Sequence, residues 1–445
     1  MKKQLFTLAW PAILEGIFQT VLQYVDTAMV GRLGAEATAT VSLSSTYNWL
    51  IHSVISAFGV AFLSYIARAI GEKNQEKIHS AANQVVFITV VVGAVFTVVT
   101  LWMAPFMPGW MGADEAIRQD ASRYYAYVNM PMLFRAATII FGAAIRATGD
   151  TKTPMRVNVF VNFLNIGLNY IFIYMLCKGA VGAGMATGIS VAVGGVMMTW
   201  AFARNSILHG EGYRFSIQCF QPNHKVLSGI MAIGLPIVMT RVASCMGHVV
   251  FTSFVSSMAT SIYAAHAIAI TAEEIFYIPG YGRQSATSTL IGNAIGEGDI
   301  KKQKEIKTIS VVSIFVLMCI TGLLLYFGAE FMMRIFTKNE QVIAIGTKLL
   351  LMVAFTEPVF GTSAVMEGIY NGMGRTKYPL FVELVSMWGV RIVGAFVCVR
   401  VLGLGITSVW VMMILNNVLK AILLAIGIFY ISKKQGIKNT ENVPI

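Results

Sequence analysis

The sequence predicts an all-α polytopic membrane protein whose twelve transmembrane helices form two lobes of six helices each. Three observations predict this fold class. Of the 445 residues, 56% are hydrophobic and only 12% are charged, a composition that would leave large apolar patches on a water-soluble protein. Apolar segments long enough to cross a bilayer recur along the whole chain. The two halves of the chain also repeat one another.

The individual helices are predicted from runs of about 20 mainly apolar residues, the length that spans the hydrocarbon core. The first half contains such segments at 7–31, 43–67, 82–104, 121–145, 157–177 and 181–203. The second half contains them at 228–254, 262–291, 308–329, 346–370, 379–399 and 405–431. Because Pro279 and Gly280 lie inside the eighth segment, we expect a kink or a break there.

An interval of 225 residues relates the two halves. Residues 69–72 (AIGE) recur at 294–297, and Pro11 and Gly149 match Pro236 and Gly374. Chance matches would not share one interval over such a length, so we infer an internal duplication. Six helices is an even number, so both halves insert with the same orientation and form a parallel repeat of the kind common in membrane transporters.

The polar stretches between and after the halves predict the domain boundaries. We expect an N-terminal lobe at 1–204 and a C-terminal lobe at 227–432. A short cytoplasmic linker at 205–226 joins them, and a polar tail occupies 433–445. The linker is too short to form a further domain.

The net charge of +12 does not indicate nucleic-acid binding once the charges are placed on the segments. With both termini in the cytoplasm, 20 of the 33 Lys and Arg residues lie on the cytoplasmic side and 8 on the opposite side. This excess follows the positive-inside rule. We therefore expect a multi-pass protein of a bacterial inner (plasma) membrane with both termini in the cytoplasm.

Several function classes lack their sequence signals. The five cysteines are dispersed, which predicts neither a disulfide framework nor a metal cluster. The chain contains no nucleotide-binding loop and no zinc-ligand spacing, so neither a cofactor nor direct ATP hydrolysis is expected. Paired intramembrane aspartates or a Ser/Lys dyad are also missing, so we do not expect an enzyme.

The first segment contains a polar stripe within the membrane. Glu15, Gln19, Gln23 and Asp26 fall within roughly 80° of one another at 100° per residue. Such a face suits a bundle interior or a wet cavity rather than lipid. Because burial disfavours the charged form of a carboxyl group, Asp26 could gain and lose a proton near neutral pH. The alternative is that Asp26 only hydrogen-bonds a neighbouring helix.

A second polar stripe lies on the fifth segment. Asn158, Asn162, Asn165 and Asn169 fall within roughly 60° of one another. Asparagine both donates and accepts hydrogen bonds, so this column could hold water or bond to Asp26 in either protonation state. The alternative is interhelical bonding for packing. We favour a lined cavity.

The second half has charges of both signs inside its segments: Arg241, Glu273, Glu274, Glu383, Arg391 and Lys420. Since three positive and three negative charges balance, a structural network of ion pairs is one interpretation. A second coupling site is the other. The 25 methionines and 27 phenylalanines suit a repackable cavity for many ligands.

Several motifs, taken together in order, resemble the multidrug and toxic compound extrusion (MATE) family. They lie at 9–13 (AWPAI), 25–31 (VDTAMVG), 146–154 (RATGDTKTP), 234–236 (GLP) and 292–296 (GNAIG). The resemblance covers nearly the whole chain. It implies a V-shaped pair of lobes around a central cavity. It also implies a monomeric secondary antiporter that exchanges cations for bulky organic cations and amphipathic drugs.

The resemblance also implies roles for individual residues. The family's first-helix aspartate falls on Asp26, and Met29 of the same motif joins the expected cavity lining. The Asn-x-x-x-Asp pair of the DinF-type branch falls on Asn165 and Asn169, and here the second member is Asn. The seventh segment lacks the glutamate of the NorM-like branch. We therefore expect a DinF-type protein with proton coupling at Asp26.

Two other functions stay open. Asp26, Asn165 and Asn169 offer the oxygen ligands that sodium prefers, so sodium could replace the proton as the coupling ion. A flippase for a lipid-linked intermediate would need a basic cavity. Arg241 and Arg391 could contribute to one, although the acidic stripe on the first segment argues against it.

Overall fold

The chain is helical throughout the part that the structure describes, residues 2–209 and 221–440 of the computed structural model. The expected linker and tail therefore fall partly outside the described residues, at 210–220 and 441–445. Helices of the first half are α1 (Lys2–Gly31), α2 (Ala35–Gly71), α3 (Gln75–Met103), α4 (Met107–Trp110), α5 (Glu115–Asn129), α6 (Met132–Ala147), α7 (Lys152–Asn169), π-helix η1 (Tyr170–Met175), α8 (Gly179–Ala203) and α9 (Ser206–His209).

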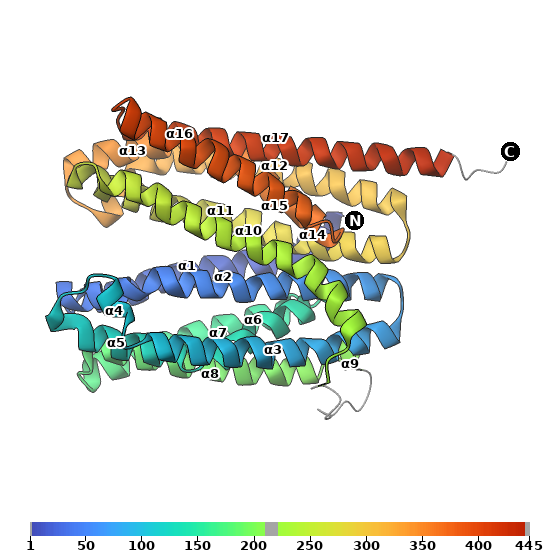
Figure 1. The fold of residues 1–445 in the computed structure, drawn as a ribbon, viewed down its shortest axis with the longest axis horizontal. Helices are drawn as coiled ribbons and strands as arrows, with labels where there is room; N and C mark the ends of the chain where they lie inside the picture. Colours follow the sequence, from blue (N-terminus) through green and yellow to red (C-terminus); the bar gives the residue numbers. More distant parts are fainter. Residues whose placement is uncertain (1, 210–220, 441–445) are drawn as a thin grey trace. The chain divides into compact units, whose positions relative to one another are not determined.

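The second half repeats this order (Figure 1). Its helices are α10 (His224–Ser256), α11 (Thr260–Gly296), α12 (Ile300–Phe336), α13 (Glu340–Ala354), α14 (Glu357–Gly372), α15 (Lys377–Glu383), π-helix η3 (Leu384–Ile392), α16 (Val393–Phe396), π-helix η4 (Val397–Val401) and α17 (Ile406–Thr440).

The predicted membrane spans are confirmed in outline. Among the described residues, nine helices are long and apolar enough to cross a membrane, and the pairs α5–α6 and α13–α14 each pass as one bent span. Helix α11 has the required length, with 37 residues, but it is too polar to pass the same test. Counting α11 as the eighth span gives the twelve that the sequence predicts.

The sequence predicts a kink or a break at Pro279, and the break is absent. Helix α11 continues through Pro279 and Gly280 to Gly296, because packing against neighbouring helices tolerates a proline inside a membrane helix. Between consecutive helices, the chain bends by 42° between α5 and α6 and by 55° between α13 and α14. Each of these bends follows a short non-helical step between two helices rather than a proline within one helix.

The internal duplication is confirmed by the helix boundaries. Four helices of the first half, shifted by 225 residues, give the boundaries of their partners: α2 becomes α11, α5 becomes α13, α6 becomes α14, and the start of α7 becomes the start of α15. Even the bend between α5 and α6 recurs at the corresponding step between α13 and α14. Positions 225 apart can therefore be compared as structural equivalents.

Two compact units make up the described chain. The first, here called the N-terminal unit, is Leu14–Val238, and the C-terminal unit combines Met1–Ile13 with Met239–Ile445. In the N-terminal unit, α2, α3, α6 and α8 pack side by side (Figure 1), and their buried apolar side chains form its largest core. In the C-terminal unit, α11 packs against α12, α13 and α14. The largest core cluster there takes most of its buried side chains from α10, α11, α12, α13 and α17.

Glycines permit the close approach of helices in the N-terminal unit. A Cβ atom added to Gly188 of α8 would lie 2.5 Å from the carbonyl oxygen of Tyr127 on α5. A Cβ atom on Gly195 would meet the backbone of Phe134 on α6. Without a hydrophobic effect between helices in lipid, such close packing is a main source of helix association.

We predict that Gly188→Ala lowers the thermal unfolding temperature of the purified protein, because the new methyl group must push α8 away from α5. Overpacking of this kind costs about 1–3 kcal/mol. Gly167→Ala is the control, since nothing lies within 4 Å of a Cβ atom there. A Gly188→Ala protein as stable as the control variant would contradict the packing argument.

Candidate functional site

Two carboxylate–asparagine pairs join α1 to α7 in the N-terminal unit. Asn158 donates to Glu15 at 2.6 Å, and Asn169 donates to Asp26 at 2.8 Å. The two pairs have the same sequence separation of 143 residues, so the helices run parallel in constant register. Eleven residues separate the pairs along each helix, about 16 Å at 1.5 Å per residue. The two polar stripes of the sequence therefore face each other.

Asp26 is held by amide groups alone. Besides Asn169, the amide of Asn165 reaches it when its oxygen and nitrogen are exchanged, and the nitrogen then donates to Oδ2 of Asp26 at 2.8 Å. That orientation gives the carboxylate a second donor, and hydrogens are assigned from such networks. No cation of the described residues forms an ion pair with Asp26. The carboxylate is thus bonded but not neutralised.

The backbone changes form directly after Asn169. The α-helical part of α7 ends at that residue, and the π-helix η1 continues from Tyr170 to Met175. Tyr174 of η1 donates to the carbonyl oxygen of Met29 at 3.0 Å, which fixes the end of α1. Wider helical turns of this kind occur often at functional sites.

A cavity of about 470 Å³ opens onto Asp26 within the N-terminal unit, a size that suits drug-like ligands. Six predicted residues line it: Gln19, Gln23, Asp26, Asn162, Asn165 and Asn169. Two other predicted residues, Met29 and Asn158, do not line it. Met29 instead accepts the bond from Tyr174, and Asn158 bonds to Glu15.

The sequence reasoning missed several lining residues. Ser42, Ser44, Ser45 and Asn48 of α2 and Tyr124 and Arg135 of the bent α5–α6 span also face the cavity. Of these residues, only Arg135 could have been predicted from the sequence. An arginine inside a predicted membrane segment is costly, which indicates a functional or structural role. The residues from α2 have no distinctive spacing.

Glu15 has a different environment from Asp26. Arg146 of α6 binds both of its carboxylate oxygens, at 2.8 and 2.9 Å. With Asn158 as a third contact, this ion pair ties α1, α6 and α7 together. The pair compensates both charges, so Glu15 is a structural element of the bundle rather than a free acid.

The second copy of the repeat lacks the Asp26 cluster. The positions 225 residues after Asp26, Asn165 and Asn169 are Phe251, Val390 and Gly394. Phe251 is buried, and a Cβ atom on Gly394 would contact Met412. The equivalent helices therefore have no carboxylate–amide cluster there, and Arg391 instead lies over the ring of Phe251. Since the fold does not require the polar cluster, bonding for packing alone is a poor explanation of it.

The charged residues of the C-terminal unit form smaller groups than the network that the sequence suggested. Lys420 of α17 binds Glu367 at 2.5 Å and Glu383 at 2.8 Å. Glu367 also accepts from Gln284 of α11 at 3.1 Å. Glu367 is thus paired inside the bundle.

The remaining members form no ion pair with that triad. Tyr277 donates to Glu273 within α11, and Arg391 lies 4.0 Å above the ring of Phe251. No ion pair among the described residues includes Arg241, Glu274 or Arg391. Both carboxylate oxygens of Glu357 are buried without a hydrogen-bond partner. Across the described part of the chain, no three His, Cys, Asp or Glu side chains could hold a metal ion.

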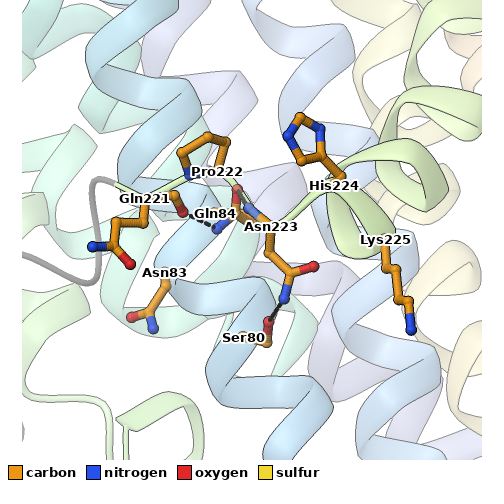
Figure 2. Close-up of a pocket in the computed structure, with 8 residues that line it drawn as sticks. All are labelled: Ser80, Asn83, Gln84, Gln221, Pro222, Asn223, His224 and Lys225. Carbon is orange, nitrogen blue, oxygen red and sulfur yellow. Dashed lines mark hydrogen bonds between the residues drawn. The ribbon is translucent and has the colours of Figure 1, made fainter.

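A second cavity, of about 530 Å³, lies where the chain enters α10 (Figure 2). Gln84 of α3 donates to the carbonyl oxygen of Gln221 at 3.0 Å and accepts from the backbone of Asn223 at 3.2 Å. Asn223 also donates to Ser80 at 3.2 Å. These bonds hold residues 221–223 against α3. We therefore interpret this polar cavity as the place where the segment before α10 attaches to α3.

We predict that Glu15→Gln destabilises the protein, because it leaves the charge of Arg146 uncompensated where the two side chains are only 13% and 18% exposed. Breaking a buried pair in this way costs about 3 kcal/mol, which thermal unfolding in detergent would register. The control is Glu330→Gln, whose ion pair with Arg334 is largely exposed and contributes little. Equal unfolding temperatures for the two variants would show that the Glu15 pair does not support the bundle.

Comparison with known proteins places the chain among membrane transporters. Its sequence matches the MatE family over residues 11–171 and 236–397, one match for each copy of the repeat. A protein of Thermotoga maritima described as "Probable multidrug resistance protein NorM" is 26% identical over 438 residues, which cover 98% of this chain and 93% of the relative. A protein of Neisseria meningitidis with the same description is 25% identical, covering 94% and 92%.

The fold agrees with this match. A solved structure titled "Crystal structure of MATE in the straight conformation" superimposes with a TM-score of 0.90 at 22% identity, covering 98% of this chain and 97% of the other. The family match covers most of the chain and includes the helix with Asp26. The chain therefore belongs to the MatE family of multidrug and toxic compound extrusion proteins, and it is a multi-pass membrane transporter rather than an enzyme.

Proposed function

We propose that this transporter is a multidrug efflux protein that exchanges protons for bulky organic cations, with Asp26 as the coupling residue. Relatives that match nearly the whole chain are described as multidrug resistance proteins, which supports the efflux of drugs. The observation that carries the coupling role is the Asp26 cluster, a carboxylate with amide partners at the wall of a drug-sized cavity.

The Asp26 cluster suits coupling because it contains no ion pair. An ion pair, such as that of Glu15 with Arg146, would compensate the charge of the carboxylate within the protein. Asparagine amides instead can donate to an ionised carboxylate, and their oxygens can accept from a protonated one. The oxygen Oδ1 of Asn169 is buried without a partner, so rotating this amide to turn Oδ1 toward protonated Asp26 breaks no bond of that oxygen. Both protonation states of Asp26 therefore have partners nearby.

The exchange follows because the proton and the organic cation compete for the carboxylate of Asp26. Ionised Asp26 attracts an organic cation into the cavity, and a proton arriving from outside the cell neutralises the carboxylate and removes that attraction. Each ligand weakens the binding of the other by the same factor, since coupling between two ligands is reciprocal. Downhill proton entry can then drive uphill drug exit without ATP.

Sodium is the second candidate for the coupling ion. The partnerless oxygen of Asn169 and the carboxylate of Asp26 are hard oxygen ligands within one cluster, as sodium requires. We place the proton first because Asp26 is the one carboxylate lining this cavity in the described structure. We further propose a DinF-type monomer in a bacterial inner membrane, with cytoplasmic termini as the loop charges indicate.

We predict that Asp26→Asn abolishes proton-driven transport. In liposomes with the extracellular face acidified, the wild type should export ethidium, whereas the variant should not. Removing the charge-assisted contact should also weaken ethidium binding by about tenfold or more, since such a contact contributes roughly 1.5–3 kcal/mol. Asp120→Asn, an exposed change on α5 that removes the same charge, should leave transport intact. Equal transport by the wild type and Asp26→Asn would remove Asp26 from the coupling role.

The proton and sodium versions give opposite results in one binding experiment. If protons compete through Asp26, ethidium affinity rises with pH between about 5 and 8, because the ionised carboxylate binds the cation. Binding should also release protons into weakly buffered solution. Replacing sodium with choline should change neither result. Affinity that is independent of pH but falls when sodium is added would establish the sodium version instead.

A further inference from the structure

Arg135 is a second charge in the cavity that contains Asp26, and the proposed coupling does not use it. Its side chain lines the cavity from α6. No carboxylate among the described residues forms an ion pair with it, and its Nε atom is buried without a hydrogen-bond partner. Its one side-chain hydrogen bond in the described structure is a long contact of 3.3 Å, from Nη2 to the carbonyl oxygen of Val128. Most of its five donors are thus unused.

An arginine in this position requires compensation that the protein itself does not supply. A guanidinium group stays charged at all working pH values, and an uncompensated charge inside a membrane helix is costly. Asp26 lines the same cavity but bonds to asparagines instead. Tyr124 lies within electrostatic reach of both charges, so the two face one cavity without pairing. The cavity therefore presents one positive and one negative group.

The alternative to ligand binding is a structural role for Arg135. The bond to Val128 lies at the end of α5, where the step into α6 frees backbone carbonyl groups, so Arg135 could serve to stabilise that bend. The second copy of the repeat has the same bend between α13 and α14. There the equivalent residue is Phe360, whose ring stacks on Tyr277. The bend therefore forms without an arginine.

We propose that Arg135 is an anion-binding residue and that the cavity takes zwitterionic aromatic molecules. The carboxylate of such a ligand binds the guanidinium of Arg135, and its ammonium or iminium group binds Asp26. Both protein charges are then compensated by one ligand, and each ligand charge is paired as it leaves water. A guanidinium fork also binds a carboxylate through two hydrogen bonds. The direction in which such a zwitterion would be transported rests on the proposed function. The preference for binding a zwitterion rests on the residues of the cavity alone.

Two fluorescent dyes that differ by one methyl ester test the proposal. Rhodamine 110 has a free carboxylate and is a zwitterion, whereas rhodamine 123 is its methyl ester and is a cation. Binding of each dye to purified protein can be followed by fluorescence anisotropy. The wild type should prefer rhodamine 110. Arg135→Gln should lower the ratio of the two affinities by about tenfold or more, the expected effect of losing a charged hydrogen bond.

The two conservative variants separate charge from structure. Arg135→Gln keeps a donor for the carbonyl group of Val128 but removes the positive charge, whereas Arg135→Lys keeps the charge. If Arg135 only supports the bend, Arg135→Gln leaves the ratio unchanged or weakens both dyes equally, and either result overturns the proposal. If it binds an anion, Arg135→Lys retains most of the preference for rhodamine 110 that Arg135→Gln loses.

The same dyes distinguish this inference from the proposed function. The protein could prefer rhodamine 110 through Arg135 and yet transport neither dye along a proton gradient. That result would support Arg135 as an anion-binding residue and overturn proton-driven efflux. Proton-driven transport of rhodamine 123 with no such preference would do the reverse. A wild type that binds neither dye contradicts both.

Discussion

An ionised side chain in the hydrocarbon core is costly unless another charge compensates it, and this constraint organises the polar residues of the structure. Some intramembrane charges obey it locally. Arg146 pairs with Glu15, and Lys420 pairs with both Glu367 and Glu383. These pairs tie helices together. Where compensation is missing, the protein retains a capacity to bind something else.

In the N-terminal cavity, two opposite charges line one space without an ion pair to compensate either of them. Asp26 has only amide partners, and Arg135 has only a backbone carbonyl group. The proton-coupling role that we propose for Asp26 and the anion-binding role that we propose for Arg135 both follow from this one feature. Together they describe a cavity that is electrically matched to a zwitterion and that becomes positive when Asp26 takes up a proton. Proton uptake would thereby favour the loss of any bound cationic group.

The duplication provides an internal comparison for these assignments. Both copies have nearly the same helix boundaries, so the fold tolerates either set of residues. Where the first copy has Asp26 and Arg135, the second has Phe251 and Phe360. An apolar side chain is sufficient for packing at both positions. The charged residues of the first copy are therefore best explained by chemistry that packing does not require.

The twelve segments, the repeat and the two polar stripes follow from the sequence alone, because lipid demands apolar runs of fixed length and a helix has a fixed period. That the stripes face each other came from the structure. Only the tertiary structure decided which polar groups meet. In the structure, Asp26 bonds to Asn169, and Glu15 pairs with Arg146. Arg135 lines the cavity, and α11 continues through Pro279. Pairing depends on contacts between helices distant in sequence, and neither composition nor periodicity encodes those distances.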